Sequence, residues 1–522
     1  SGIPFLAAGQ HSALYPPSVV YYVLPLWLAY GWFTVLNLWL AGVFMYLFAR
    51  GLGIGRAGAM LAGVVYQLGG FVLASVVFQM MIGAIPWLPL MLLMLEFIIR
   101  KKRLFGHKTT IPWVAVGAFA IAMNVLAGHV ELTLYSLLIS GFYAGGRWLH
   151  DYMRLRQMRL MLTQAGWMLS MVILGIGLAS IQFFPLVEFA QDNWRAERSD
   201  YATVAGYAHE TRDILQFALP NFYGNPTHHR IFDIFSFEWV NDWDTDTENY
   251  SPQSHTDWGI KNYVEGALYL GILPLLLAIY AVVDRTMWTI EQNSKIMEVF
   301  MREPPYRAIF STMGLLSVTF MFGLPTYRII YALPGFNQLN SPFRWIYALT
   351  VAIAILSAFG LDALQRRIAE KKVVRETRLG YAMIAMGVLV FIGLALSYLS
   401  FPSIEGRIGS VLENLALAPR AFGADAVELF YSYQFANVSV FALMLILSGI
   451  VFAWVGRMRM YQGVRLWSVF AIAVVVMDLM IASWGFNPAS DPLLLDYTPQ
   501  SVSWLQERYQ EDGAFRYTTL ED

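Results

Sequence analysis

Residues 366–378 read RRIAEKKVVRETR, and the residues that follow them, 379–400, read LGYAMIAMGVLVFIGLALSYLS. The first segment carries six Lys or Arg side chains, and the second has no charged residue. A helix needs about 20 apolar residues to cross the hydrocarbon core of a bilayer, so the second segment predicts a membrane span. Lys and Arg near the ends of spans stay on the cytoplasmic side, so the first segment predicts an inner loop.

The same alternation of basic loop and hydrophobic stretch recurs along the chain. Six loops hold 24 of the 35 Lys and Arg residues but only 7 of the 36 Asp and Glu residues, at 50–56, 100–108, 147–159, 284–307, 366–378 and 457–465. All six are therefore expected inside, and the long segment 191–262 is expected outside. This pattern predicts a polytopic membrane protein.

The composition agrees with that class. Hydrophobic residues make up 57% of the 522 residues and charged residues 14%, which is typical of a membrane protein. The net charge of −1 gives no indication of a nucleic-acid partner. Because the chain has no cysteine, disulfides, thiol nucleophiles and cysteine-ligated metals are excluded.

We expect an all-α fold with about twelve membrane-spanning helices, an even number that leaves both ends of the chain outside. The expected spans are 29–49, 57–78, 80–99, 110–125, 130–146, 166–187, 263–283, 308–324, 345–363, 380–400, 436–456 and 466–484. The opening residues, SGIPFLAAGQHSALYPP, are typical of the middle of an outer loop. We therefore expect a further span before Ser1. The final residues, DGAFRYTTLED, are typical of the start of a strand and predict a soluble part after Asp522.

Four regions follow from these spans. Membrane helices are expected at 1–190 and 263–484, an extracytoplasmic cap at 191–262, and the start of another outer segment at 485–522. The cap is rich in polar side chains, which cannot enter lipid because each unsatisfied polar group there costs several kcal/mol. Long loops of this kind usually carry function, so the working surface is expected to face outward.

One candidate for chemistry is NVLAGHVEL at 124–132, which puts His129 and Glu131 at the outer membrane boundary. Two residues apart, these side chains diverge on a regular helix. They share a side only if Gly128 begins a locally extended break, where they could form a proton-handling couple. Otherwise each acts alone, or both only satisfy backbone groups at the break.

Arg328 and Arg344 are basic residues on the side that is otherwise poor in them. A guanidinium at the start of an outer-leaflet span suits a phosphate, which it can bind through two parallel hydrogen bonds. The alternative is that each side chain extends toward lipid headgroups, as Arg at span ends commonly does.

Several further residues lie at the outer boundary. The alternating acids Asp242, Asp244 and Asp246 suggest a divalent-cation loop, but Thr247 and Gln253 stand where the Ca²⁺ loop needs Gly and Glu, so a solvated acidic loop is the alternative. No other metal site and no cofactor is predicted. Five residues frame the cap or the first loop and are candidates for proton transfer or sugar contact, with helix capping or loop packing as the alternative: Gln10, His11, Glu188, Tyr263 and Glu265.

Several segments, taken in order, resemble the bacterial YfhO-like membrane proteins of the GT-C glycosyltransferase superfamily. They are SGIPFLAAGQHSALYPP, LAGHVELTLY, ALPNFYGNP, LYLGILPLLLA and NQLNSPFRWIYALTVAIAILSAFGLDAL. The resemblance implies an enzyme of the bacterial cytoplasmic membrane that takes a sugar from a polyprenyl-phosphate donor on the outer face.

The resemblance also implies a catalytic acid in the first outer loop. This chain has no Asp or Glu before Glu96, so the main base is expected upstream of Ser1. His129, Glu131 and Glu188 would then support catalysis, and Arg344 would bind the donor phosphate.

Three hypotheses about function follow. The first is a glycosyltransferase that modifies an envelope glycan, with the bilayer, the lipid-linked donor and the glycan acceptor as its partners. The second is a non-catalytic scaffold subunit that packs beside other membrane proteins, with its charged groups satisfied internally and a large apolar lateral surface. The third is a lipid-linked-sugar transporter, which needs polar residues through the inner halves of the spans, and those halves look largely apolar.

Overall fold

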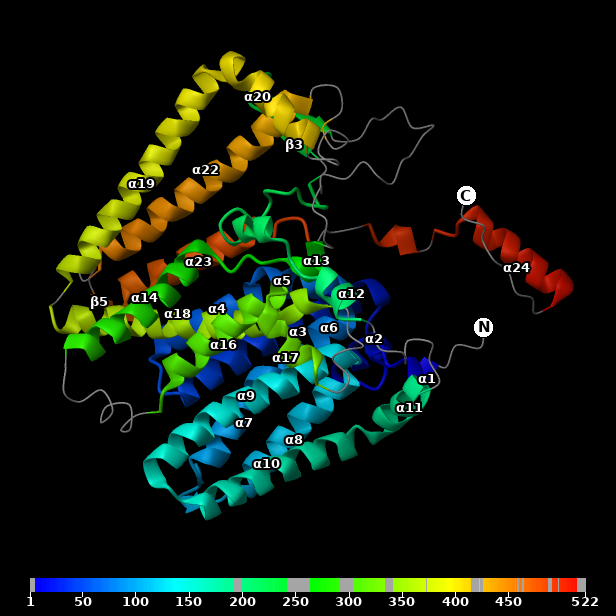
Figure 1. Ribbon diagram of the computed structural model, residues 1–522. Helices are drawn as coiled ribbons and strands as arrows, with labels where there is room; N and C mark the ends of the chain where they lie inside the picture. The colour runs from blue at the N-terminus through cyan, green and yellow to red at the C-terminus, as the bar shows by residue number, and fades with distance from the viewer. Residues whose placement is uncertain are drawn as a thin grey trace.

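The hydrophobic stretches form helices, because backbone N–H and C=O groups in a bilayer must be hydrogen-bonded within the chain. Figure 1 shows the computed structural model, in which most of these helices run side by side across the molecule. The structure describes residues 5–191, 200–228, 230–241, 263–291, 304–333, 341–371, 373–414, 422, 426–455, 457, 460–461, 464–486, 491–495 and 497–513.

The first half of the chain is helical apart from two short hairpins. Its elements are α1 (Phe5–Ala8), η1 (Pro16–Val19), α2 (Val20–Val23), α3 (Leu26–Gly51), α4 (Arg56–Leu68), α5 (Gly70–Ala74), η2 (Ser75–Val77), α6 (Gln79–Ala84), α7 (Trp87–Ile99), β1 (Arg103–Leu104), β2 (His107–Lys108), α8 (Ile111–Leu126), α9 (Val130–Leu155), α10 (Met158–Leu178), α11 (Ser180–Gln191), α12 (Tyr201–Gly206), η4 (Thr211–Phe217), β3 (Arg230–Asp233) and β4 (Glu238–Asn241). Each pair of strands is antiparallel, and β3 and β4 pair with Arg230 opposite Asn241 and Asp233 opposite Glu238.

The described part of the second half of the chain is also helical apart from one short hairpin. Its elements are α13 (Tyr263–Gly266), α14 (Ile272–Glu291), α16 (Tyr306–Met321), η5 (Pro325–Tyr327), α17 (Arg328–Tyr331), η7 (Pro342–Trp345), α18 (Ile346–Ala369), α19 (Val374–Leu399), α20 (Phe401–Asn414), α22 (Ala426–Ala453), β5 (Met460–Tyr461), β6 (Val464–Arg465), α23 (Leu466–Ala482), η9 (Pro492–Leu495) and α24 (Gln500–Asp512). Strands β5 and β6 form a third antiparallel hairpin.

Six helical stretches in the described residues are long and apolar enough to cross a bilayer: Leu26–Gly51, Gln79–Ile99, Met158–Leu178, Pro342–Ala369, Val374–Leu399 and Ala426–Ala453. Two bent pairs raise the number to eight if each counts as one span, namely Arg56–Leu68 with Gly70–Val77, bent by 41°, and Tyr306–Met321 with Pro325–Tyr331, bent by 99°. The chain is therefore a mostly helical protein with the character of a multi-pass membrane protein. The expected number of twelve exceeds these six to eight.

Two of the expected spans are interrupted at a point where they meet. The break between α4 and α5 lies at Gly69, and the expected span at 263–283 becomes a regular helix only at Ile272. The backbone N–H of Gly70 donates to the carbonyl of Tyr269 at 2.8 Å. A backbone hydrogen bond therefore joins the two interrupted segments. Non-helical backbone is tolerated at membrane depth only when protein satisfies it in this way.

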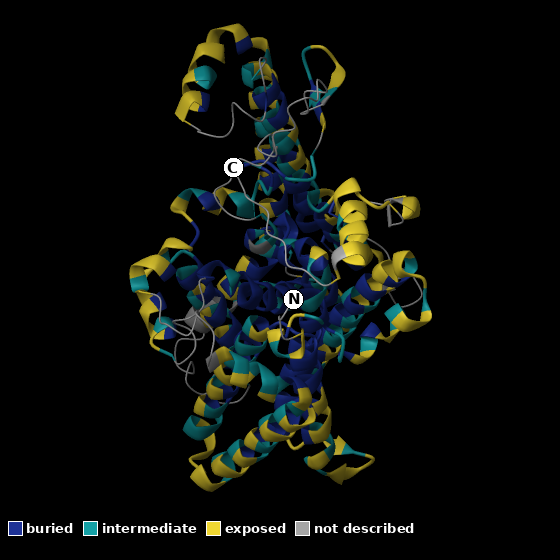
Figure 2. Cartoon of the chain, turned by 90° about the vertical axis from the view of Figure 1, so that its right-hand side faces the viewer, coloured by how far each residue is buried: buried dark blue, intermediate teal, exposed yellow. Residues whose placement is uncertain are grey.

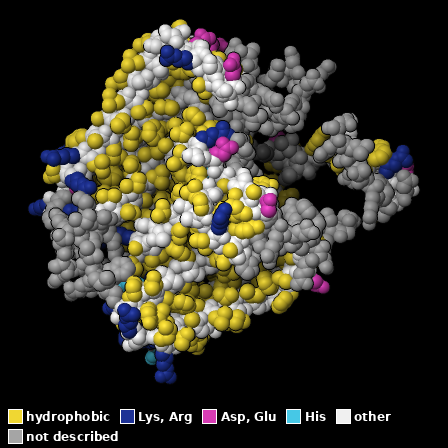
Figure 3. Space-filling view, viewed as in Figure 1, with side chains coloured by type: hydrophobic (Ala, Val, Ile, Leu, Met, Phe, Trp, Pro, Cys, Tyr) yellow, Lys and Arg dark blue, Asp and Glu magenta, His cyan; other side chains and the backbone are white. Residues whose placement is uncertain are grey.

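The core lies around α7 and α18, and the periphery is made by α10, α19 and α22. In the most apolar 18-residue part of Gln79–Ile99, 94% is buried inside the protein. In the corresponding part of Val374–Leu399, 17% is buried. Figure 2 shows buried residues through the middle of the molecule and exposed ones on the arms above and below it. Figure 3 shows a broad hydrophobic surface over the α19 side, with many of the Lys and Arg side chains along the left edge.

We call the helix ends next to the loops at 50–56, 100–108, 147–159, 366–378 and 457–465 the basic end.

Part of the expected cap has a small core of its own. Residues Tyr223, Ile231, Leu412, Phe422, Leu429, Phe430 and Tyr433 pack together, so β3 and the preceding turn rest on α20 and α22. The acids Asp242, Asp244 and Asp246 lie outside the described residues.

Candidate functional site

The break between α8 and α9 lies at the end of the bundle opposite the basic end. Gly128 has a φ of +93°, which favours glycine, and His129 is extended with φ −112° and ψ 89°. The Nδ1 atom of His129 accepts a hydrogen bond from the N–H of Leu132 at 3.1 Å, so the imidazole caps the N-terminus of α9. The backbone is extended at His129, which is the condition under which His129 and Glu131 could share a side, and it orients His129 as a helix cap.

The capping role limits the proton chemistry of His129. Its side chain is buried, and burial together with the positive charge of Arg344 lowers its pKa from 6.5 to about 3. With Nδ1 occupied by the helix N–H, the proton of the neutral ring is on Nε2. His129 therefore stays neutral near pH 7 and is a poor proton acceptor.

Glu131 forms an ion pair with Arg344 and accepts a hydrogen bond from the hydroxyl of Ser341. Both charged side chains are mostly buried, with 12% exposed for Glu131 and 13% for Arg344. One turn further along α9, Tyr135 donates to the backbone carbonyl of Ser341 at 2.9 Å. We call His129, Glu131, Ser341 and Arg344 the Glu131–Arg344 cluster. Glu131 is thus coupled to Arg344, and no hydrogen bond joins it to His129 in the described structure.

The main catalytic base expected upstream of Ser1 lies outside the described residues. These residues begin at Phe5, so Ser1 itself is also outside them. Among the supporting candidates within the chain, Glu131 is the acid that contacts Arg344 directly. Glu131 and Arg344 therefore form the centre of the candidate site.

The first loop of the chain packs on the same break. The hydroxyl of Ser12 donates to the carbonyl of Ala127 at 2.6 Å, and the side chain of Gln182 donates to the carbonyls of Gly9 and Val125 at 3.2 and 3.1 Å. These hydrogen bonds join the loop to the C-terminal end of α8 and to the first turn of α11.

Gln10 and His11 lie in this hydrogen-bonded loop. Gln10 is exposed. The Nδ1 atom of His11 accepts from the N–H of Ala13 at 3.0 Å, and its ring stacks on Phe5 with 4.5 Å between centroids. The loop therefore lies close to the cluster, with His11 engaged in loop packing.

A second histidine, His209, lies near Phe343, the residue before Arg344, and was not among the residues that the sequence predicted. Nδ1 of His209 is 3.3 Å from a carboxylate oxygen of Asp213, and its ring is 6.4 Å from that of Phe343 between centroids. Asp213 also accepts from the N–H of Glu210 at 3.0 Å. The carboxylate holds the Nδ1 proton, which leaves the lone pair on Nε2, and this buried atom has no hydrogen-bond partner among the described residues. The signal in the sequence was the spacing of four between His209 and Asp213.

The other predicted residues lie in separate surroundings. Arg328 is exposed and its guanidinium lies 5.2 Å from the centre of the Tyr201 ring. Glu188 is exposed on α11, and no hydrogen bond or ion pair within the described structure joins it to His129 or Glu131. The Glu265 side chain is outside the described residues.

Tyr263 belongs to a polar network built by the segment ALPNFYGNP. Its hydroxyl donates to Asn221 at 2.9 Å, accepts from Asn225 at 3.3 Å, and its ring stacks on Phe486 at 5.1 Å. The side chain of Gln434 in α22 donates to the carbonyl of Phe222 at 2.8 Å. The network therefore joins the cap to α13 and α22.

A buried ionic cluster lies near the basic end, in a part of the bundle that the sequence predicted to be largely apolar. Glu96 of α7 has no exposed surface and pairs with Arg147 at 3.0 Å and Arg100 at 2.6 Å. Tyr143 donates to the same carboxylate at 2.6 Å, and Tyr306 donates to it as well. Every partner comes from this chain, so the cluster holds α7, α9 and α16 together and gives no specific support to transport.

The described residues contain no group of three or more His, Asp or Glu side chains placed to hold a metal ion. No family model matches the chain, and searches of curated proteins and of solved structures return no match either. A proposal about function therefore rests on the geometry of the Glu131–Arg344 cluster.

Proposed function

We propose that this protein is a GT-C-type glycosyltransferase of the bacterial cytoplasmic membrane, related to the YfhO-like proteins. It would transfer a sugar from a polyprenyl-phosphate donor to an envelope glycan on the outer face. The observation that carries the proposal is the buried pair of Arg344 and Glu131 at the end opposite the basic loops. A guanidinium that already binds a carboxylate offers the same parallel donors to a phosphate.

The proposal includes twelve spans and an outward-facing cap. The six long stretches and the two bent pairs each cross once. The shorter apolar helices α8, α14 and α23 and the first half of α9 supply the other four, with α11 continuing α10. The basic loops then lie in the cytoplasm, as retention of Lys and Arg requires.

In the proposed reaction, the donor phosphate displaces Glu131 from Arg344. The acceptor hydroxyl attacks the anomeric carbon, the bond from that carbon to the phosphate oxygen breaks, and Arg344 stabilises the negative charge of the leaving phosphate. The released Glu131 carboxylate accepts the hydroxyl proton. His209, whose Nε2 lone pair is held in place by Asp213, is the alternative acceptor.

The test is sugar transfer in proteoliposomes that contain a labelled polyprenyl-phosphate sugar and an envelope glycan acceptor. Arg344→Gln, made together with Glu131→Gln so that no buried charge is left unpaired, should lower the rate by about 100-fold. Arg344→Lys should not restore it, because Lys lacks the two parallel donors. Arg328→Gln is the control and should transfer normally. Normal transfer by the Arg344 variants would overturn the proposal.

The scaffold hypothesis is the second candidate, and two observations favour it. Arg344 and Glu131 form an ion pair with each other inside the chain, and α19 exposes an apolar stripe that includes Leu389, Ile392 and Leu396. A scaffold predicts that Leu389→Gln with Leu396→Gln changes the size of the native complex in mild detergent while Arg344→Gln does not. The enzyme hypothesis predicts loss of transfer for Arg344→Gln whatever the size of the complex.

A further inference from the structure

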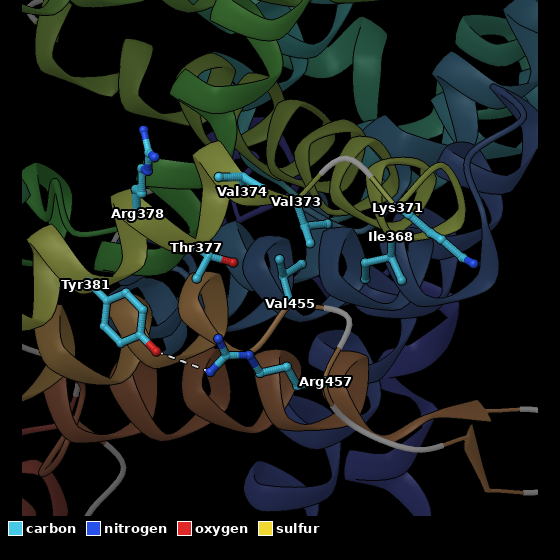
Figure 4. A pocket seen from close by; sticks show the side chains of 9 residues that line it. All are labelled: Ile368, Lys371, Val373, Val374, Thr377, Arg378, Tyr381, Val455 and Arg457. Carbon is cyan, nitrogen blue, oxygen red and sulfur yellow. Dashed lines mark hydrogen bonds between the residues drawn. The ribbon is translucent and has the colours of Figure 1, made fainter.

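A cavity of about 440 Å³ opens at the basic end, where α18 ends, α19 begins and α22 ends. Figure 4 shows its lining, with Val373 and Val455 among the apolar residues of the floor. The end of α18 and the start of α19 are consecutive in the sequence, and the end of α22 joins them from a later part of the chain. Arg344 precedes the first turn of α18 and the cavity lies at its last turn, so the cavity is at the opposite end of this helix from the Glu131–Arg344 cluster.

Three cations line the cavity: Lys371, Arg378 and Arg457. None of the three forms an ion pair with an acid in the described part of the chain, and no Asp, Glu or His is among the lining residues. Arg457 donates to the hydroxyl of Tyr381 at 3.1 Å, which orients its guanidinium across the cavity. Figure 4 shows the Lys371 and Arg378 side chains directed away from Arg457, so these two cations add positive charge around the rim of the cavity.

The surroundings favour a ligand that is both anionic and apolar. The face of α19 that lines the cavity with Val374 and Tyr381 continues along the helix to Val388 and Ile392, which are 44% and 49% exposed. Uncompensated cations beside an exposed apolar helix at the end of a membrane bundle match a phosphate headgroup with acyl chains. A free phosphate would use the cations and leave the apolar surface without a partner.

We propose that this cavity binds the phosphate headgroup of an anionic phospholipid from the leaflet at the basic end, with the acyl chains along α19. Arg457 contacts the phosphate directly, Lys371 and Arg378 add charge at the rim, and Tyr381 positions Arg457. The site takes a lipid irrespective of whether the protein transfers sugars, so its test does not depend on the proposed function.

The experiment is native mass spectrometry of the full chain in detergent, titrated with phosphatidylglycerol, with phosphatidylcholine of the same acyl chains, and with inorganic phosphate alone. Wild type should retain phosphatidylglycerol more tightly than phosphatidylcholine. Arg457→Gln and Lys371→Gln should each weaken that binding by about fivefold, the factor that one basic residue contributes at an anionic lipid surface. Both side chains are exposed, so the variants should remain folded.

Arg159→Gln is the matched control, because Arg159 is an exposed residue of another basic loop outside the cavity. It should bind phosphatidylglycerol like wild type. Tyr381→Phe, which removes only the hydroxyl that holds Arg457, should weaken binding less than Arg457→Gln does. Equal binding of the two lipids, equal loss in Arg159→Gln, or displacement of the lipid by millimolar inorganic phosphate would each overturn the assignment.

Discussion

Glu131 and Arg344 show what single residues disclose in the sequence and what they do not. The extended break at Gly128 was predictable, because glycine and the change of hydrophobic pattern are local signals. The partner of Glu131 was not, because Arg344 follows more than two hundred residues later and no local pattern encodes such a contact. The two arginines of the outer side also looked alike in sequence, yet one is buried in an ion pair and the other is exposed beside Tyr201.

The first prediction concerns this pair. Removing one partner of a buried ion pair leaves the other charge uncompensated, so Glu131→Gln or Arg344→Gln alone should lower the free energy of unfolding by about 3 kcal/mol. The double variant should cost clearly less than the sum of the two. Thermal unfolding of the four proteins in one detergent measures the coupling. Strictly additive effects would show that the interaction between the two side chains does not stabilise the protein.

The second prediction concerns His129 and pH. Its pKa is about 3 in the folded protein and near 6.5 when unfolded, because burial and Arg344 disfavour the charged ring. As the pH falls, the unfolded state binds the proton first, so the stability from this residue is complete above about pH 6.5 and is lost between pH 6.5 and 3.

His129→Asn keeps a side chain that caps helices well and removes the titration. In unfolding measured from pH 7 to pH 4, the variant should lose less stability than wild type over that interval. The control is His107→Asn, which changes an exposed histidine in the β1–β2 hairpin and should leave the pH dependence as it is in wild type. Parallel curves for wild type and His129→Asn would contradict the assignment.

At the scale of elements, hydropathy predicted where apolar helices form but not where they are interrupted. The break at Gly69 and the late start of α14 depend on each other and on Asp478, which accepts from the N–H of Ile272 at 2.8 Å. Helix propensity and hydropathy are properties of neighbouring residues, whereas these interruptions are stabilised by partners from distant segments. Six to eight of the expected spans correspond to long apolar helices or bent pairs, some of them shifted along the sequence, and the interrupted ones are less regular than hydropathy predicted.

The third prediction tests how α19 packs against α22. A Cβ added at Gly449 would lie 2.7 Å from the carbonyl oxygen of Gly380 and 2.8 Å from the side chain of Ile384, so only glycine allows this approach. Gly449→Leu should destabilise the protein by about 2 kcal/mol through overpacking. Gly393→Leu is the control in α19, because nothing lies within 4 Å of a Cβ there. Tryptophan-monitored thermal unfolding compares the two, and equal melting temperatures would refute the close contact.

At the scale of the whole molecule, the distribution of charge predicts an orientation. The loops that hold most of the Lys and Arg residues lie at one end of the helices, and the Glu131–Arg344 cluster lies at the other. The general architecture was readable because the bilayer imposes it on composition and length. The buried cluster around Glu96 was not, since its arginines were assigned to solvated loops by their positions in the sequence.

The fourth prediction tests this orientation. Because the chain has no native cysteine, single cysteines give a clean signal. Phe105 and Ile214 are 92% and 57% exposed, the first in a basic loop and the second in the cap region. In right-side-out vesicles, a membrane-impermeant maleimide should label Ile214→Cys and leave Phe105→Cys unlabelled until the vesicles are opened. The reverse labelling would invert the topology.

The ionic cluster around Glu96 also has a consequence for biogenesis. Arg100, in the next turn, is available to the carboxylate as soon as α7 has been synthesised, whereas Arg147 follows only at the far end of α9. An isolated charge in hydrocarbon is costly. During synthesis, the pair with Arg100 should therefore let α7 enter the lipid before α9 has emerged, and Arg147 should complete the cluster when α9 follows.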